Sequence, residues 1–188
     1  LQQLDDIKSE FLAHVSHELR TPMASIQEGT HLLLDEIPGP LTQDQRTTLR
    51  IMSDSSRRLM YLISTILDLS KMESGMMEYR FAPTDLRRVA DISVNKIRLL
   101  ADAKQVRFLV EAPVERHWVR ADSARIEQVL DNLLSNALKY SPEGAAVKLH
   151  MEPRRDAGLL FVDVTDCGPG IPTEEVPHIF ERFYQGRT

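Results

Sequence analysis

The chain reads FLAHVSHELRTP from Phe11 to Pro22, and the apolar residues in this stretch have helical spacing. The same spacing extends on both sides, from Leu1 to about Asp35, with charged residues between the apolar positions. The pattern predicts one long amphipathic helix. Pro22 removes a backbone hydrogen-bond donor inside this helix, so we expect a bend one turn from His17.

A helical hairpin is predicted from the residues that follow. Residues 37–40 read IPGP and should end the first helix, because proline cannot continue it and glycine accepts the geometry of a turn. A second helix is predicted over residues 42–73. Its coiled-coil seam has steps of three and four and consists of Leu49, Met52, Ser56, Leu59, Ile63 and Ile66. Two arms cannot bury a wide apolar stripe, so we expect two hairpins to form a homodimeric four-helix bundle.

A second domain is predicted after the helical pattern stops near Gly75. We expect the hairpin over residues 1–73, a hinge over 74–83 and the second domain over 84–188. Residues 81–84 read as a linker that caps a helix beginning near Asp85. The further elements expected are helices over 85–103 and 123–139 and strands over 106–111, 117–121, 145–152 and 159–165. This order predicts an α+β protein whose second domain is an α/β sandwich.

The composition is that of an ordinary globular protein. The 188 residues are 42% hydrophobic and 27% charged, with a net charge of −5, which disfavours nucleic acid as a partner. The one cysteine, Cys167, excludes an internal disulfide and fits the cytoplasm. No stretch approaches the roughly 18 to 20 apolar residues of a membrane helix, so we expect no membrane contact by this segment. An anchor upstream of Leu1 stays possible.

The histidine in the first helix has neighbours suited to acid–base chemistry. On a helix His17 lies beside Thr21, one turn later, and Glu18 is adjacent in sequence. Near neutral pH His17 exposes a neutral ring nitrogen that can attack a phosphoryl group, and Glu18 can accept the other ring proton. Taken alone, His17 would more simply be an exposed helix residue. A metal site of His14 and His17 is disfavoured because no further ligands cluster nearby.

The predicted helix over 123–139 has an amide-rich face. The sequence from Arg125 to Pro142 reads RIEQVLDNLLSNALKYSP, which places Asn132, Asn136 and Lys139 on one face. The face expected to be buried consists of Ile126, Val129, Leu130, Leu133 and Leu134. Amides and a lysine suit a nucleotide phosphate with Mg²⁺, which needs few protein ligands beside phosphate and water. Without other evidence, these residues could equally be a solvated surface.

A glycine-containing loop follows the last predicted strand. Residues 162–172 read VDVTDCGPGIP, in which the strand pattern stops at Asp166. The nearby glycines let a ligand approach the backbone, and a carboxylate there can accept a hydrogen bond from an exocyclic amine. Alone, such a segment is more often an ordinary turn.

Four segments resemble, in order, the boxes of sensor histidine kinases. Residues 11–22 resemble the H box, 125–142 the N box, 162–172 the G1 box, and IFERFYQG at 179–186 the F box before the ATP lid. The H-box resemblance implies that His17 is phosphorylated by ATP and passes the phosphoryl group to an aspartate of a response regulator. It implies that Glu18 assists as an acid–base residue and that Thr21 positions water when the regulator is dephosphorylated.

The other boxes imply a Bergerat-type ATP-binding domain. By this resemblance Asn136 coordinates Mg²⁺, and the residues that contact the phosphates or shape their pocket are Asn132, Lys139 and Tyr140. Asp166 would bind the adenine amino group, with Gly168 and Gly170 forming the pocket floor. The F box would anchor the lid through Phe180 and Phe183, and Arg182 is a weaker candidate for a phosphate contact or for docking against the bundle.

The resemblance also favours one reaction over another. Related ATPases such as DNA gyrase carry, where Asn132 stands, a glutamate that activates water, and an amide cannot act as that base. This favours phosphoryl transfer to a protein side chain over ATP hydrolysis. The chain ends at Thr188, before the lid and the second glycine-rich box of the family, so we expect an ATP-binding domain that is incomplete at its C-terminus.

Three other functions are left open by the sequence. The chain could be a phosphoacceptor and dimerisation module without kinase activity of its own. The missing lid and second glycine-rich box are the reason for this alternative. An autonomous gyrase-like ATPase and a plain coiled-coil scaffold are weaker alternatives. The expected setting is the cytoplasmic part of a receptor that is anchored in the inner membrane upstream.

Overall fold

The computed structural model describes residues 2–113, 118–154, 156–181 and 184, and for residues 2–13 and His17 it describes the backbone alone. The chain divides into two compact units, Leu1–Glu78 and Tyr79–Thr188. Within the described residues, no helix is both long enough and apolar enough to cross a membrane.

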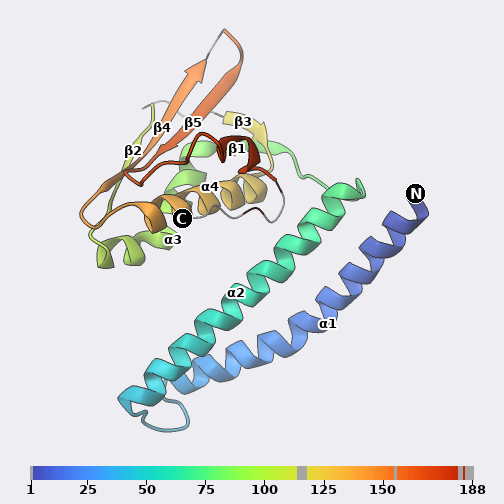
Figure 1. Cartoon of the computed structure of the whole chain (residues 1–188), viewed down its shortest axis with the longest axis vertical. Coiled ribbons are helices and arrows are strands. Elements are labelled where there is room, and N and C mark those ends of the chain that lie inside the picture. The colour runs from blue at the N-terminus through green and yellow to red at the C-terminus, as the bar shows by residue number, and fades with distance from the viewer. Residues whose placement is uncertain (1, 114–117, 155, 182–183, 185–188) are drawn as a thin grey trace. The chain divides into compact units, whose positions relative to one another are not determined.

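The first unit is the predicted helical hairpin. Helix α1 (Gln2–Leu34) and helix α2 (Gln43–Glu73) run side by side in opposite directions (Figure 1). Pro22 lies inside α1, which continues as α-helix on both sides of it. Both helix predictions are therefore confirmed to within a residue or two at their ends.

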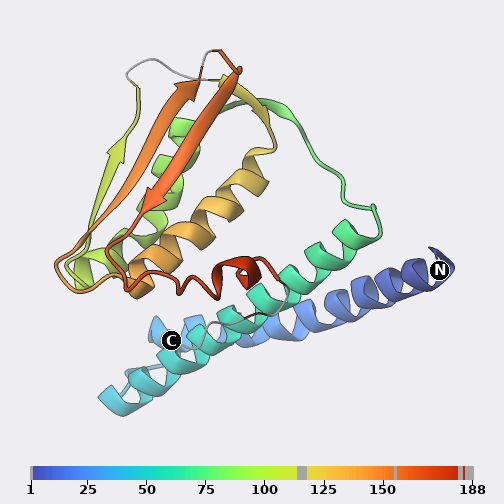
Figure 2. The same ribbon diagram turned by 45° about the horizontal axis from the view of Figure 1, so that its top comes forward.

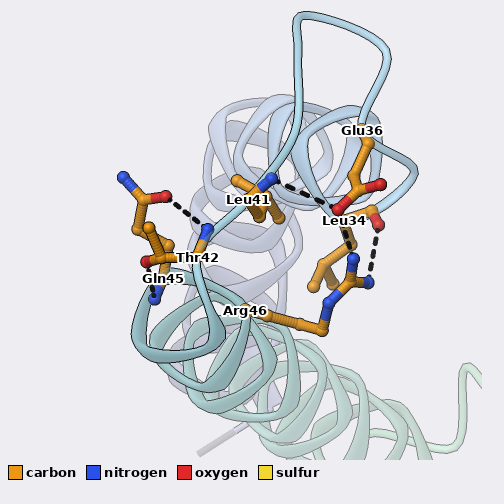
Figure 3. Close-up of polar contacts among 6 residues, drawn as sticks. All are labelled: Leu34, Glu36, Leu41, Thr42, Gln45 and Arg46. Carbon is orange, nitrogen blue, oxygen red and sulfur yellow. Dashed lines mark hydrogen bonds and ion pairs between the residues drawn. The ribbon is translucent and has the colours of Figure 1, made fainter.

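A set of polar contacts holds the loop between the two helices (Figure 3). Thr42 caps α2 in a capping box, in which its side chain accepts from the Gln45 amide and the Gln45 side chain accepts from the Thr42 amide. Glu36 has a left-handed backbone, with φ of 57°, and its Oε1 accepts from the Leu41 amide at 3.2 Å and from Arg46 Nη2. The loop is thus tied to α2 at both of its ends.

The interior of the hairpin contains small polar side chains. Its buried residues include Leu67 and the polar residues Ser16, Thr30, Ser53, Ser56 and Ser70. Large apolar side chains lie exposed along both helices, among them Leu19, Ile26, Met52, Leu59, Leu62 and Ile66. A single hairpin therefore does not bury the apolar residues of its own predicted seam.

The described residues of the second unit form two sheets and two main helices. Its elements are β1 (Ala82–Asp85), α3 (Leu86–Ala103), β2 (Arg107–Glu111), β3 (Trp118–Ala121), α4 (Ser123–Tyr140), β4 (Ala146–Arg154), β5 (Leu159–Thr165) and a short 3₁₀ helix, Val176–His178. The larger sheet has the order β2-β4-β5, with β2 parallel and β5 antiparallel to β4. The smaller sheet pairs β1 with β3 in antiparallel fashion. The predicted α+β sandwich is confirmed.

One expected linker segment is a strand instead. Residues 81–84 were expected to lead into a helix as a linker and cap, but Ala82–Asp85 forms β1 and pairs with β3. Thr84 does not cap α3, because its Oγ1 donates across the strand pair to the Ala121 carbonyl at 3.1 Å. The cap is Asp85, whose side chain accepts from the amides of Arg87 and Arg88. The expected hinge over 74–83 is therefore shortened at its end by β1.

The core lies between the larger sheet and one face of α3 and α4 (Figure 2). Ala90, Leu134, Val147 and Leu149 have no exposed surface, and the cluster around them draws residues from both helices and all three strands. One sequence prediction is wrong here.

The predicted buried face of α4 is rotated in the structure. Val129 and Leu133 were expected in the core but are 53% and 45% exposed. The buried stripe instead consists of Leu130, Leu134, Ala137 and Leu138, with Ile126 partly buried beside it. Five apolar positions of α4 span more of the helix circumference than the sheet covers, so Val129 and Leu133 remain on the outer face.

Candidate functional site: the exposed face of α4 and the loop after β5

Helix α4 is fixed at both ends by side chains. At its start, Asp122 Oδ1 accepts from the amides of Ala124 (3.1 Å) and Arg125 (3.3 Å). At its end, Lys104 Nζ donates to the carbonyls of Leu138 (2.8 Å) and Lys139 (2.9 Å). A cation at a helix C-terminus satisfies orphan carbonyls and favours the helix dipole. Sequence reasoning missed Lys104, whose only signal was a lysine at the end of the preceding helix.

The outer face of α4 carries the predicted phosphate and metal residues. Asn132 and Asn136 lie one turn apart on this face and are both exposed. Tyr140, one turn further, is also exposed, and Lys139 Nζ donates to its hydroxyl at 3.0 Å while lying 4.6 Å from its ring centroid. This contact holds a positive charge against Tyr140 at the last turn of α4.

The loop after β5 places the predicted adenine residue at the end of a strand. β5 ends at Thr165, and Asp166 follows it with an exposed side chain. Asp166 Oδ1 accepts from the Gly168 amide at 2.7 Å, and Oδ2 is a second acceptor of the same carboxylate. A carboxylate held in this way can accept a hydrogen bond from the exocyclic amine of adenine.

This loop packs against the last turn of α4. A Cβ on Gly168 would lie 2.8 Å from Asp166 Oδ1 and 3.2 Å from both the Cβ and the carbonyl oxygen of Tyr140. Ser141, which is buried, accepts from the Cys167 amide at 3.4 Å. The structure therefore brings Asp166 and Gly168 together with Tyr140, from two motifs that are about 26 residues apart.

Glycine is required at two positions of the loop for different reasons. Gly168 has no room for a side chain, whereas Gly170 has open space around it but a φ of +76°, which side chains rarely adopt. Both requirements agree with the prediction that the glycines form the floor of a ligand site.

The second unit also contains an open cavity away from this loop. It has a volume of about 860 Å³ and lies among β1, the first turns of α3, Trp118 and the start of α4. Its lining includes Thr84, Arg87 and Glu127, but none of the predicted nucleotide residues. The predicted nucleotide residues lie instead on the outer face of α4 and in the loop after β5.

The predicted phosphoacceptor lies within α1. His17 is helical, and its side chain is outside the described part of the structure. Glu18 and Thr21, which follow it, both have exposed side chains, and Ser25 Oγ donates to the Thr21 carbonyl at 3.3 Å. His14 is exposed one turn earlier.

The predicted F box and the predicted metal site can be compared with the structure only in part. Arg182 and Phe183 of the predicted F box lie outside them, and Phe180 is 94% exposed. Across the described side chains, no group of three or more His, Cys, Asp or Glu residues is placed to hold a metal ion. The exposed Asn136 side chain offers an amide oxygen, a type of ligand that Mg²⁺ can use together with phosphates and water.

The fold is an α/β sandwich that carries the predicted nucleotide residues, joined to a helical hairpin that carries His17. Comparison with protein families identifies both parts. A model described as "His Kinase A (phospho-acceptor) domain" matches residues 7–75. A model described as "Histidine kinase-, DNA gyrase B-, and HSP90-like ATPase" matches residues 121–188. The chain belongs to the sensor histidine kinases of two-component signal transduction, and this is the core of such a kinase.

Individual relatives support the same assignment. The sensor histidine kinase GlrK of Escherichia coli is 35% identical over 186 residues, which are 99% of this chain and 38% of GlrK. The structure of full-length ShkA in complex with AMPPNP aligns with a TM-score of 0.69 at 26% identity, over 88% of this chain and 35% of ShkA. The structure of histidine kinase ThkA in complex with response regulator protein TrrA aligns with a TM-score of 0.61 at 26% identity, over 94% of this chain and 50% of the matched chain. The chain spans between 12% and 38% of the length of five curated relatives that it matches.

Proposed function

We propose that ATP phosphorylates His17 and that the phosphohistidine then passes its phosphoryl group to an aspartate of a response regulator. The observation that carries this proposal is that the phosphoacceptor segment and the predicted nucleotide residues lie in different units of the chain. The hairpin presents the segment His17-Glu18-Thr21 on α1, and the second unit brings Asp166 and Gly168 against the end of α4. ShkA, which is similar to this chain, was solved with an ATP analogue, and ThkA with a response regulator.

The proposed transfer is an in-line displacement. A neutral ring nitrogen of His17 attacks the γ-phosphorus of ATP, a nitrogen–phosphorus bond forms, the bond from that phosphorus to the bridging oxygen breaks, and ADP leaves. The positive charge on the imidazole is relieved when Glu18 accepts the proton of the other ring nitrogen. Such a role needs a carboxylate that solvent and substrate can reach, and Glu18 is exposed.

The residues of the second unit would bind and orient the nucleotide. Asp166 Oδ2 would accept from the adenine amino group, and Lys139 and Tyr140 would contact or enclose the phosphates. Mg²⁺, held by Asn136 with the phosphates, would offset negative charge on the transferring group. Asn132 lies on the exposed face of α4, where an amide can bind phosphate or a hydrated ion but cannot activate water for hydrolysis.

The hairpin is proposed to act as a homodimer. Its exposed apolar side chains, Leu19, Ile26, Met52, Leu59 and Ile66 among them, are left uncovered by the single hairpin. Pairing with a second copy in a four-helix bundle would bury them. The exposed segment around His17, rather than this apolar surface, would receive the response regulator, and Thr21 would position water for dephosphorylation of that regulator. We place this activity in the cytoplasm, where ATP is available.

A phosphoacceptor module without kinase activity of its own is the second candidate. It would accept phosphate on His17 from another kinase or from a phosphorylated regulator. It differs from the first proposal in one property, because it would not label itself with ATP. The nucleotide-facing residues on α4 and after β5 favour the kinase.

Two matched substitutions test the first proposal. The chain is incubated with γ-labelled ATP and Mg²⁺, and retained label is tested for lability in acid and stability in alkali, which identify phosphohistidine. His17→Gln should abolish the label, whereas His14→Gln, one turn earlier on the same helix, should retain it. Asn136→Ala should weaken labelling and raise the Mg²⁺ concentration needed for half-maximal labelling.

The outcomes separate the candidate functions. Acid-labile label that persists in His17→Gln would overturn the assignment of His17. An unlabelled wild-type chain that nevertheless takes label from a phosphorylated regulator would support the phosphoacceptor module. Rapid release of phosphate with no labelled protein would instead indicate an ATPase.

A further inference from the structure

Asp122 divides its two carboxylate oxygens between two segments of the second unit. Oδ1 accepts from the amides of Ala124 and Arg125 and so caps α4. Oδ2 accepts from the amide of Arg80 at 2.9 Å, although Arg80 lies 42 residues earlier in the chain. One side chain thus connects the start of the nucleotide-facing helix to the segment by which the chain enters the unit.

The Arg80 end of this bond lies in a segment without helix or strand. Helix α2 ends at Glu73 and β1 begins at Ala82, so residues 74–81 form neither. Arg80 is flanked by the rings of Tyr79 and Phe81, whose centroids are 5.9 Å apart. The bond to Asp122 therefore fixes the backbone of this segment before the first strand begins.

Asp122 is ionised in this position. Its pKa is held below the ordinary value chiefly by the hydrogen bond from the Arg80 amide; burial opposes this, and the bonds from Arg125 and Ala124 lower the pKa further. Both oxygens are then acceptors, which the arrangement of three amide donors requires.

We infer that Asp122 is a positioning residue, which fixes where the segment from the hairpin joins the ATP-binding unit relative to α4. The inference rests on the proposed function, because that function requires the segment to deliver the nucleotide to His17. Six residues, 74–79, separate the end of α2 from Arg80, and they reach at most about 20 Å when extended. Opening the bond would lengthen this connecting segment by residues 80 and 81.

The lengthened segment should slow phosphorylation without weakening nucleotide binding. The effective concentration of one tethered partner near the other falls roughly as the −3/2 power of tether length, so growth from six to eight residues lowers it about 1.5-fold. Without the bond, the backbone at Arg80 is no longer held in one direction, which should lower the effective concentration further. The residues that face the nucleotide, Asn136 and Asp166 among them, do not contact Asp122.

Asp122→Asn removes the bond to Arg80 and little else. Asparagine caps helices about as well as aspartate, so its carbonyl oxygen can keep the bonds to Ala124 and Arg125. Its amide nitrogen then stands where Oδ2 stood and faces the Arg80 amide, donor against donor. Asp85→Asn is the matched control, since Asp85 Oδ1 caps α3 through Arg87 and Arg88 and no bond to its second oxygen is recorded among the described residues.

The test measures hydrogen exchange at the Arg80 amide, the rate of His17 labelling at saturating ATP, and the ATP concentration for half-maximal labelling. In Asp122→Asn, Arg80 should exchange at least tenfold faster, labelling should slow by about 1.5-fold or more, and half-saturation should be unchanged. Asp85→Asn should leave all three at the wild-type values.

Three results would overturn the inference: unchanged exchange at Arg80 in Asp122→Asn, equal slowing in Asp85→Asn, or an effect on half-saturation in place of rate. If the wild-type chain takes no label from ATP, the proposed function is wrong, but the positioning role of Asp122 is not thereby excluded. The comparison of hydrogen exchange at the Arg80 amide then tests the Asp122–Arg80 bond by itself.

Discussion

Lys96 on α3 donates to Asp131 on α4 across 2.6 Å, and its ammonium also forms an ion pair with Glu127, one turn earlier on α4. These bonds, that to Asp131 first, raise the pKa of Lys96 above its ordinary value. Both ion pairs join α3 to α4, and Asp131 directly precedes Asn132 in the sequence. They therefore help to hold the helix that carries Asn132 and Asn136 on α3.

Lys96→Met should destabilise the second unit. Removing the ammonium leaves Glu127 and Asp131 to repel each other at a spacing of one helical turn. Because the Lys96 side chain is 45% exposed, we expect a loss in the free energy of unfolding of only about 0.5 to 1 kcal/mol. Arg87→Met is the control, since Arg87 is equally exposed and pairs with Asp91 on its own helix.

The effect of Lys96→Met should depend on pH in a defined direction. A pKa raised in the folded state gives stability that is complete below the unfolded pKa and is lost as the pH rises through the folded one. Urea unfolding of wild type and variant should therefore differ at pH 8 and converge above about pH 10.5. A difference that grows with pH would contradict this account of the pair.

Much of the fold was predictable because local signals and packing agree. The hairpin follows from helical spacing and from the IPGP break, and the Thr42 capping box lies within one residue of the predicted helix start. β1 could not be predicted, because its residues Ala82-Pro83-Thr84 carry turn chemistry and form a strand only through pairing with β3. Which apolar residues of α4 are buried depended on how much of the helix the sheet covers, which spacing alone does not specify.

The sequence motifs of the candidate site were predictable, but the residues that hold those motifs in place were not. Asn136 and Asp166 carry chemistry that a pattern can suggest, and the structure places them on an exposed helix face and at a strand end. Lys104 and Ser141 hold α4 and the glycine loop through contacts with residues 26 to 35 positions away. Such long-range contacts leave no local pattern in the sequence.

Asp166→Asn should change which base the site prefers. If the asparagine carbonyl keeps the bond from the Gly168 amide, its NH₂ group replaces Oδ2 and faces the adenine amine as a second donor. A lost hydrogen bond to a charged group corresponds to about 1.5 to 3 kcal/mol, or a roughly 10- to 100-fold weaker ADP affinity. Binding of GDP, whose base presents a carbonyl at the corresponding position, should weaken less or improve.

Titrations with fluorescent ADP and GDP measure this change in preference. Asp163→Asn is the control, because Asp163 is an exposed carboxylate on β5, the strand that Asp166 follows, and lies opposite His150 on β4. Equal loss of ADP affinity in both variants would remove Asp166 from the adenine site. Gly168→Ala should also weaken ADP binding, because its Cβ would lie 2.8 Å from Asp166 Oδ1.

Two buried serines of the second unit should respond oppositely to alanine. Ser93 in α3 has no exposed surface, and its Oγ has no hydrogen-bond partner among the described residues. Ser141 is 1% exposed, and its Oγ accepts from the Cys167 amide. Burial of an unpaired hydroxyl costs about 1 to 3 kcal/mol, so Ser93→Ala should stabilise the unit, whereas Ser141→Ala should destabilise it by about 1 kcal/mol. Calorimetric unfolding of both variants checks the signs, and destabilisation by Ser93→Ala would show that its hydroxyl is bonded.

Arg46 connects the end of α1 with the loop that follows it (Figure 3). Its Nη1 donates to the Leu34 carbonyl at 3.4 Å, and its Nη2 pairs with Glu36, which also accepts from the Leu41 amide. Arg46→Met should leave the Leu34 carbonyl and the Glu36 carboxylate without this partner and destabilise the hairpin by about 0.5 to 1 kcal/mol.

The effect of Arg46→Met should shrink at high salt, because screening weakens the charge pair. Arg50→Met, one turn further along α2, should change stability by less than about 0.5 kcal/mol. Urea unfolding at a fixed protein concentration is the measurement, since dimer formation would make apparent stability depend on concentration. A double-mutant cycle with Glu36→Gln isolates the pair, and a coupling energy near zero would assign the loop's rigidity to the Thr42 capping box and not to Arg46.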